Sequence, residues 1–239
     1  LPVRNSGTLG GNVANGSPIG DSMPLLIALG ASVVLMRWKK TKTGGEIAHR
    51  ELRLEDLYTG YRTNVMRPDE LLCWIKVPRP TGHALSAAPA RPKPASAPLG
   101  GSEPLAPSAQ AEGAAVGSVG AEQLLRVYKI SKRFDDDISA VCLAIQMTVK
   151  GGVVQQVSIG AGGVAAVPAR ARQTEAALLG QPWTADTVMA GAAALRAEFQ
   201  PISDMRASGD YRQTVLGNPL QRFWLESQGL QGLNLDSLK

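Results

Sequence analysis

The sequence predicts an α+β protein made of two small folded units that are joined by a long insertion. Three observations support this fold class. Strand-like runs precede helical runs in the second half of the chain, as in α+β domains. Glycine-containing turns separate neighbouring strand-like runs, as in antiparallel hairpins. Ala, Pro, Ser and Gly dominate residues 79–122 and set them apart from the units on either side, residues 1–78 and 123–230.

The composition limits the classes of protein that this chain can belong to. With 239 residues, 44% of them hydrophobic, it can bury one or two ordinary cores, since domains usually run to ~100–200 residues. The net charge of +5 does not indicate nucleic-acid binding, because aromatic residues are few and basic residues cluster only at Arg37–Lys42. No apolar run reaches the ~20 residues of a membrane span, so we expect no membrane contact and a cytoplasmic location.

The two cysteines indicate neither a metal site nor a disulfide framework. Cys73 and Cys142 lie in separate apolar strand-like runs without C-x-x-C spacing, so we expect two buried thiols. The chain starts at Leu1 without methionine and enters a glycine-rich segment directly. We therefore expect a segment upstream of Leu1.

The first unit opens with a loop and a short helix. The segment Asn5–Gly20 is rich in glycine and asparagine, which predicts a loop. Asp21 is placed to cap a helix over Leu25–Leu29, and Gly30 supplies its left-handed exit.

Strand-like runs follow this helix. Ala31–Trp38 and Glu46–Arg50 flank a Lys-Thr-Gly-Gly turn and predict a hairpin. Leu54–Tyr58 predicts a single helical turn, and Leu71–Val77 predicts one further strand that ends before Pro78.

The insertion, residues 79–122, is expected to be disordered. A chain of this composition buries too little apolar surface to offset a conformational entropy of ~1–2 kcal/mol per residue. Residues 231–239 form a tail after the second unit.

The sequence of the second unit predicts a three-stranded antiparallel sheet followed by helices. Its strands are Leu124–Ile130, Ile138–Val149 and Val153–Ile159, with a charged turn between the first two. A loop of small residues is expected at Gly160–Gly163. The helical runs that follow are Ala169–Leu179, Ala185–Phe199 with Thr184 as its cap, and roughly Tyr211–Ser227.

The paired glycines Gly10 and Gly11 are the first candidate for chemistry. Consecutive glycines let backbone amides approach a phosphate without an intervening side chain. The helix expected after Asp21 turns a positive dipole end to the same region. Taken alone, a double glycine is more often a mobile turn than a phosphate site, and these glycines match neither G-x-G-x-x-G nor the G-K-[ST] loop. Neighbouring side chains add donors: Thr8, Asn12, Asn15 and Ser17.

The whole string from Val3 to Asp21, VRNSGTLGGNVANGSPIGD, resembles the FAD-binding segment of molybdenum hydroxylase flavin domains. In that family the pattern S/T-x-G-G-N is followed nine residues later by Asp. The resemblance implies that Asp21 accepts a hydrogen bond from a ribityl or ribose hydroxyl besides capping its helix. It also implies that a run of residues lies near the FAD diphosphate: Thr8, Leu9, Gly10, Gly11 and Asn12.

Two more positions extend this resemblance. Leu72, in the string Pro68–Leu72, matches a position that packs against FAD, although a strand leucine ordinarily belongs to a core. Lys129, after Tyr128, matches a lysine beside the flavin, where a cation would favour the reduced, anionic form. An ordinary lysine at a strand edge is the alternative for Lys129.

Two charged segments also resemble the family. Lys132–Ile138 is similar to an R-R-E-D-D-I loop beside the flavin, from which Phe134 departs. Its three adjacent acids also suit a metal site, but acids on a turn between strands without a fourth ligand more often form a solvated loop. Ser203–Arg212 resembles the D-x-R-A-S-x-x-Y-R signature of bacterial flavin subunits. We interpret this signature structurally, with Ser208 or Asp210 as a helix cap and with Arg206 and Arg212 available to bridge domains or subunits.

The resemblance implies the second half of a two-subdomain FAD-binding (PCMH-type) domain, followed by a carbon monoxide dehydrogenase flavoprotein C-terminal-like domain. It implies the FAD-binding part of a xanthine dehydrogenase, which passes electrons from molybdenum and iron-sulfur centres through FAD to NAD during hypoxanthine or xanthine oxidation. Those centres would sit on a partner subunit or domain, so no catalytic residue and no metal ligand is expected here. This piece alone would bind FAD weakly.

Two alternatives stay open. One is the flavoprotein of an aldehyde oxidase or carbon monoxide dehydrogenase type enzyme, since the substrate pocket lies elsewhere. The other is a non-catalytic assembly module that docks partners through the helical end of the second unit.

Overall fold

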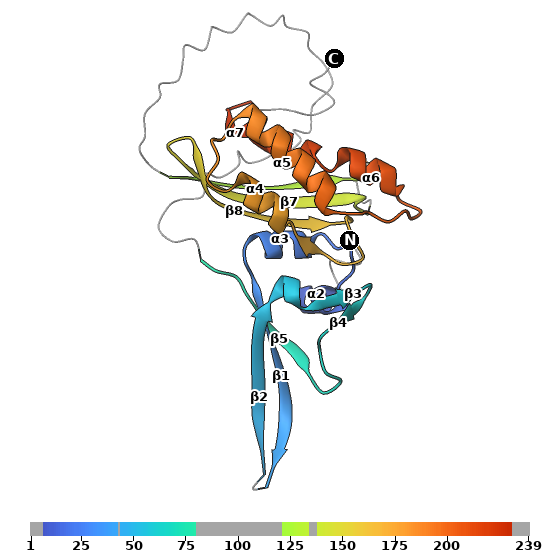
Figure 1. Ribbon diagram of the computed structural model, residues 1–239. Coiled ribbons are helices and arrows are strands. Elements are labelled where there is room, and N and C mark those ends of the chain that lie inside the picture. The colour runs from blue at the N-terminus through green and yellow to red at the C-terminus, as the bar shows by residue number, and fades with distance from the viewer. Residues whose placement is uncertain (1–6, 43, 80–120, 134–137, 231–239) are drawn as a thin grey trace, which may run out of the picture.

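The computed structural model describes residues 7–42, 44–79, 121–133 and 138–230 (Figure 1). It has two α+β units, each with an antiparallel sheet, which confirms the predicted fold class. Several predictions fall outside the described residues: the start of the FAD-like string at 3–6, nearly all of the insertion 79–122, the acids at 135–137, and the tail 231–239.

The glycine-rich segment predicted as a loop contains a helix, so that prediction is wrong. Helix α2 spans Leu9–Asn15. The Thr8 hydroxyl accepts a hydrogen bond from the Gly11 amide at 3.1 Å, and Gly16, at φ 59°, ends the helix in the left-handed region. Val13 is fully buried. Caps at both ends and one apolar anchor outweigh the low helix propensity of the two glycines.

The rest of the first unit follows the predicted order. Helix α3 begins one residue after Asp21, and the hairpin strands pair in antiparallel register with a third strand on the other side, in the order β2-β1-β5. The predicted helical turn is a short 3₁₀ helix. The bounds are α3 Ser22–Ala28, β1 Ser32–Thr41, β2 Gly44–Arg53, η1 Leu54–Asp56, β3 Tyr58–Gly60, β4 Thr63–Asn64 and β5 Leu71–Lys76.

The hairpin of β1 and β2 projects away from the rest of the molecule (Figure 1). Only its base is packed, where Val33 and Leu35 are fully buried with Leu54 and Leu57. Farther out, Trp38 is 61% exposed. The first unit therefore has a small core and a long exposed sheet.

Cys73 is exposed, so the prediction of two buried thiols is wrong for this residue. The register between β1 and β5 shifts at this point, because Leu35 pairs with Leu72 and Val34 pairs with Trp74. Cys73 is the extra residue of this bulge. Cys142 is buried, as predicted.

The second unit contains the predicted three long antiparallel strands and a short fourth one, in the order β6-β7-β8-β9. The predicted loop at Gly160–Gly163 is mostly strand, because β8 continues to Gly162. The predicted start of the first helix at Ala169 forms β9 instead. The strand bounds are β6 Glu122–Ile130, β7 Val141–Lys150, β8 Val153–Gly162 and β9 Ala169–Arg170.

Helices cover one face of this sheet and enclose the larger core (Figure 1). The predicted last helix is two helices, with the break at Gly217 and Pro219 in the first turn of the next. Thr184 occupies the predicted cap position, but its side chain makes no capping bond. The helix bounds are α4 Arg172–Leu178, α5 Ala185–Glu198, α6 Gly209–Val215 and α7 Asn218–Ser227.

The opposite face of the sheet receives α3 from the first unit (Figure 1). A Cβ atom at Gly160 would lie 2.0 Å from the carbonyl oxygen of Pro24, and the Gly163 amide donates to the Pro18 carbonyl at 2.7 Å. A side chain at position 160 would therefore collide with the α3 backbone. The glycines of β8 are where the two units meet.

Candidate functional site

The amino-terminal end of α2 lies against strand β5. A Cβ atom at Gly10 would lie 3.9 Å from Cδ2 of Leu72, so two positions assigned to FAD by resemblance are neighbours. Thr8, Leu9 and Gly11 are exposed around them. The Gly11 amide already bonds to Thr8, whereas the described residues provide no acceptor for the amides of Leu9 and Gly10. These two amides are the donors that the helix end offers to a ligand.

The two asparagines predicted as phosphate donors hold α2 in place. Asn12 Oδ1 accepts from the Ser22 hydroxyl at 2.5 Å, which ties α2 to α3. Asn15 Oδ1 accepts from the Arg62 guanidinium at 3.2 Å. Ser17 is half-buried and its carbonyl accepts from the Gly20 amide at 3.0 Å, in the turn that leads to α3.

Asp21 turns its carboxylate to the second unit. Its Oδ2 lies 3.1 Å from Lys129 Nζ on β6, and its Oδ1 accepts a short hydrogen bond from the Ser139 hydroxyl, just before β7. Asp21 occupies the predicted N-cap position of α3, but its side chain makes no capping bond to that helix. Burial raises the pKa of the Cys142 thiol to about 12, and the negative charge of Asp21 adds to this shift. The four side chains form one cluster across the two units.

Apart from Asn15 and Ser17, the predicted site residues thus fall into two groups. One is the corner of α2 and β5, which contains Thr8–Asn12 and Leu72; the other is the pair Asp21 and Lys129. Asn12 links them, because its partner Ser22 follows Asp21 in the chain. Ser139 was missed by the sequence reasoning, since no motif or spacing marks it.

A separate pocket of about 430 Å³ lies beside the charged segments. The Lys132 ammonium reaches the Met205 carbonyl at 3.2 Å on one side of it. Burial disfavours ionisation of Asp204, but the amides of Arg206 and Ala207 and the Arg212 guanidinium outweigh it. The pKa of this carboxyl therefore lies below its usual value.

Arg212 is buried and is not available to bridge units or subunits, contrary to the prediction. Its guanidinium donates to Asp204 at 2.7 Å and to the Gly163 carbonyl at 3.3 Å, both within the second unit. Arg206 pairs more loosely with Asp204, at 3.6 Å. The Ser208 hydroxyl accepts from the Tyr211 amide at 3.2 Å, which confirms the predicted cap of α6.

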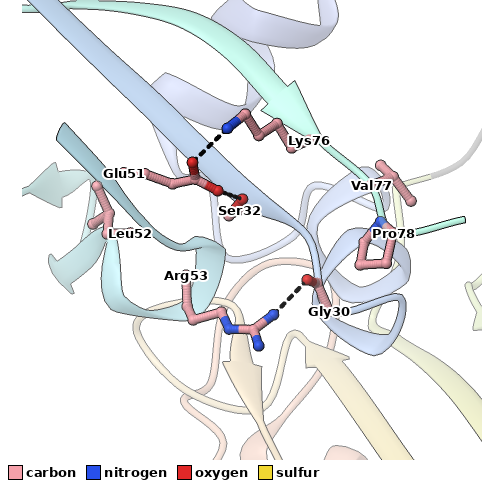
Figure 2. A pocket seen from close by; sticks show the side chains of 8 residues that line it. All are labelled: Gly30, Ser32, Glu51, Leu52, Arg53, Lys76, Val77 and Pro78. Carbon is pink, nitrogen blue, oxygen red and sulfur yellow. Dashed lines mark hydrogen bonds and ion pairs between the residues drawn. The ribbon is translucent and has the colours of Figure 1, made fainter. Parts of the chain in front are cut away.

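Another pocket opens at the base of the hairpin, away from both groups of predicted residues. Figure 2 shows Glu51 between the Ser32 hydroxyl and the Lys76 ammonium. Both groups donate to the Glu51 carboxylate, each at 2.5 Å. Arg53 donates to the Gly30 carbonyl at 2.7 Å. The charges in this pocket already have partners within the chain.

Metal ligation finds no support in the described part of the chain. No group of three or more His, Cys, Asp or Glu side chains there is arranged to hold a metal ion. In the same residues, no helix is long and apolar enough to cross a membrane.

Two family models match the chain in sequence. The model described as the FAD binding domain in molybdopterin dehydrogenase matches residues 1–80, and the CO dehydrogenase flavoprotein C-terminal domain matches residues 126–227. The chain belongs to the flavoprotein family of the molybdenum hydroxylases. FAD is therefore the cofactor of its first domain type.

The individual proteins to which this chain is similar are different enzymes of this family. The chain is 28% identical to nicotinate hydroxylase hnxS of Emericella nidulans, over 98% of this chain and 14% of that protein. It is 28% identical to the carbon monoxide dehydrogenase medium chain of Afipia carboxidovorans, over 92% of this chain and 60% of that protein. Xanthine dehydrogenase of Drosophila pseudoobscura pseudoobscura is 27% identical, over 75% of this chain and 10% of that protein.

A solved carbon monoxide dehydrogenase from Hydrogenophaga pseudoflava has the same fold. The TM-score is 0.65 at 26% identity, covering 92% of this chain and 60% of the solved chain. The chain thus spans 60% or less of the length of each of these proteins.

Proposed function

We propose that this chain is the FAD-binding part of a xanthine dehydrogenase type enzyme. The observation that carries the proposal is the arrangement of Asp21 and Lys129. These two residues match separate FAD positions of the family and lie far apart in the sequence, yet their charged groups are 3.1 Å apart. Asn12 and Ser22 join this pair to the corner of α2 and β5.

The corner of α2 and β5 fits a diphosphate and an adjoining apolar surface. The amides of Leu9 and Gly10, which have no acceptor among the described residues, suit phosphate oxygens, and Gly10 places no side chain between them and Leu72. Thr8 and Gly11 would fix this turn, while Asn12, Asn15 and Ser17 would keep the helix in position. Leu72 would supply an apolar contact.

Asp21 and Lys129 would act at the sugar and ring portions of the cofactor. The side chain of Asp21 is 42% exposed, and its carboxylate retains accepting capacity for a ribityl or ribose hydroxyl. Lys129, 44% exposed beside it, would place positive charge where electrons arrive. When bound, FAD accepts electrons and passes a hydride on; the residues of this chain bind it, orient it and tune its charge.

The wider role rests on the relatives. Medium-chain relatives belong to enzymes with further chains, so we infer that a partner subunit or domain supplies the molybdenum cofactor and iron-sulfur clusters. The purine substrate, NAD as acceptor, a cytoplasmic location and the domain limits 1–78 and 123–230 are parts of the same proposal. The similarity to nicotinate hydroxylase over 98% of the chain favours a second candidate, hydroxylation of another nitrogen heterocycle.

The experiment that tests the proposal is purification of the natural protein with the chains that accompany it. We expect a flavin absorbance spectrum, NADH-linked dye reduction and reduction of the flavin by xanthine. Reduction of the flavin by nicotinate or an aldehyde, but not by xanthine, would assign the enzyme to another branch of the family. A colourless protein that FAD does not restore would leave only the assembly-module alternative.

Substitution of Gly11 tests the diphosphate assignment. A branched side chain there should lower FAD content, but a Cβ atom at Gly11 would also lie 2.8 Å from the Thr8 hydroxyl that caps α2. Thr8→Ala, which removes the cap and leaves the space open, is therefore the control for Gly11→Val. We expect Gly11→Val to lose more FAD than Thr8→Ala. Equal FAD content in both variants would overturn the assignment.

A further inference from the structure

Among the described residues, the groups that hold the carboxylate of Asp21 all come from the second unit. Lys129 reaches it from β6, and Ser139 donates to its other oxygen from the residue pair that leads into β7. The thiol of Cys142, paired with Lys129 across the two strands, lies against the same carboxylate. A residue of the first unit thus takes its orientation from the second.

Ser139 differs from Lys129 in how it holds Asp21. Lys129 is 44% exposed, and an ion pair between exposed groups stabilises little because water competes for both charges. Ser139 is only 2% exposed, so its hydroxyl is shielded from water and Asp21 is the acceptor it has. A buried hydroxyl that donates to a carboxylate fixes the position of that carboxylate.

The packing of α3 leaves this contact little freedom. Gly160 and Gly162 allow the backbone around Pro24 to lie directly on β8, and the Gly163 amide bonds to the Pro18 carbonyl. Asp21 lies between Pro18 and Pro24 in the chain. Its main chain is therefore fixed on the sheet, and the Ser139 hydroxyl selects the direction of its side chain.

We propose that Ser139 is a positioning residue of the flavin site, which orients Asp21 from the second unit and makes the FAD affinity of the first unit depend on the second. This inference rests on the proposed function, because it takes Asp21 to be a cofactor residue. Ser139 does not contact the cofactor itself. Its hydrogen bond leaves part of the Asp21 carboxylate exposed, and this exposed part faces the cofactor.

The test is titration of the purified apoprotein with FAD, followed by flavin fluorescence and absorbance. Ser139→Ala should weaken FAD binding about fivefold to tenfold, because the carboxylate loses its fixed direction. Ser158→Ala is the matched control. Its hydroxyl is buried on β8 with no hydrogen-bond partner among the described residues, so its removal should leave the affinity within about twofold.

A second variant separates positioning from general damage to the fold. In an Asp21→Ala background, Ser139→Ala should cause no further loss of FAD affinity, because its acceptor is gone. Loss of the same size in both backgrounds would overturn the proposal. So would wild-type affinity in Ser139→Ala. If the unmodified protein binds no FAD at all, the proposed function fails first, and this outcome is distinct from the other two.

Discussion

The two units of this chain differ in how they are stabilised. The second unit surrounds a large core with a sheet and four helices, and about twice as many apolar residues are fully buried there as in the first unit. The first unit has short helices, a small core and a hairpin that extends into solvent. Yet most of the candidate cofactor residues lie on the first unit. A binding surface on the less packed unit is held in shape by the better packed one.

The contact between the units should therefore be the most sensitive place in the molecule. We expect Gly160→Val to reduce the free energy of unfolding by about 4 kcal/mol, since its side chain would collide with the Pro24 carbonyl. Urea denaturation measures this loss. Gly10→Ala is the control, because a Cβ atom there meets nothing closer than 3.9 Å and should change stability by under ~1 kcal/mol. Similar losses in the two variants would remove the contrast between interface and surface glycines.

A second prediction concerns the internal order of the second unit. Arg212→Met should cost about 3 kcal/mol, because it leaves the Gly163 carbonyl and the Asp204 carboxylate without their buried partner. Arg206→Met removes a more exposed partner of the same carboxylate and should cost under ~1 kcal/mol. Thermal unfolding of both variants would show the difference. A larger loss in Arg206→Met would mean that the signature segment stabilises the fold in another way.

The stability of the first unit should depend on pH in the acid range. The Arg50 guanidinium and the Arg67 amide bond to Glu70, and they lower its carboxyl pKa to about 2 against the opposing effect of burial. Because the folded state has the lower pKa, this contribution is present above the unfolded pKa near 4.5 and is lost as pH falls toward about 2. Glu70→Gln should lower the free energy of unfolding by about 2 kcal/mol at neutral pH. It should also reduce the further loss of stability between about pH 4.5 and pH 2. If the variant loses stability at acid pH as steeply as the unmodified protein, Glu70 is not the source of this pH dependence.

The smallest expected effect distinguishes the two cysteines. A thiol reagent should label Cys73 in the native protein and reach Cys142 only after unfolding, since Cys142 is buried and its pKa is raised to about 12. Mass spectrometry of the labelled chain would count the modified thiols. Cys73→Ser should leave stability within ~0.5 kcal/mol. Native labelling of Cys142 would indicate that the units separate readily.

Much of the fold follows from local sequence. Alternation and turn residues predicted the hairpin of β1 and β2 and the three long strands of the second unit, because these signals act between neighbouring residues. Helix α2 was missed because its stability comes from the Thr8 cap and the burial of Val13, which outweigh the propensity of Gly10 and Gly11.

The candidate site was only partly accessible to the same reasoning. Asp21 was recognised, but its partners Lys129 and Ser139 come from the other unit, and no local pattern specifies a contact over such a separation. The exposure of Cys73 depends on a bulge, which alternation alone does not locate. The glycines of β8 were interpreted as a loop because the helix that lies on them comes from elsewhere in the chain.

The close seating of α3 on β8 also bears on the order in which this protein acquires its structure. Helix α3 leaves the ribosome long before β8 does, so the surface around Pro24 has no partner during much of synthesis. Contacts between segments so distant in sequence form late, because a long chain must first close into a loop. We expect the amino-terminal unit to reach its final form only after the later sheet exists. During synthesis the uncovered face of α3 is then a natural target for chaperones.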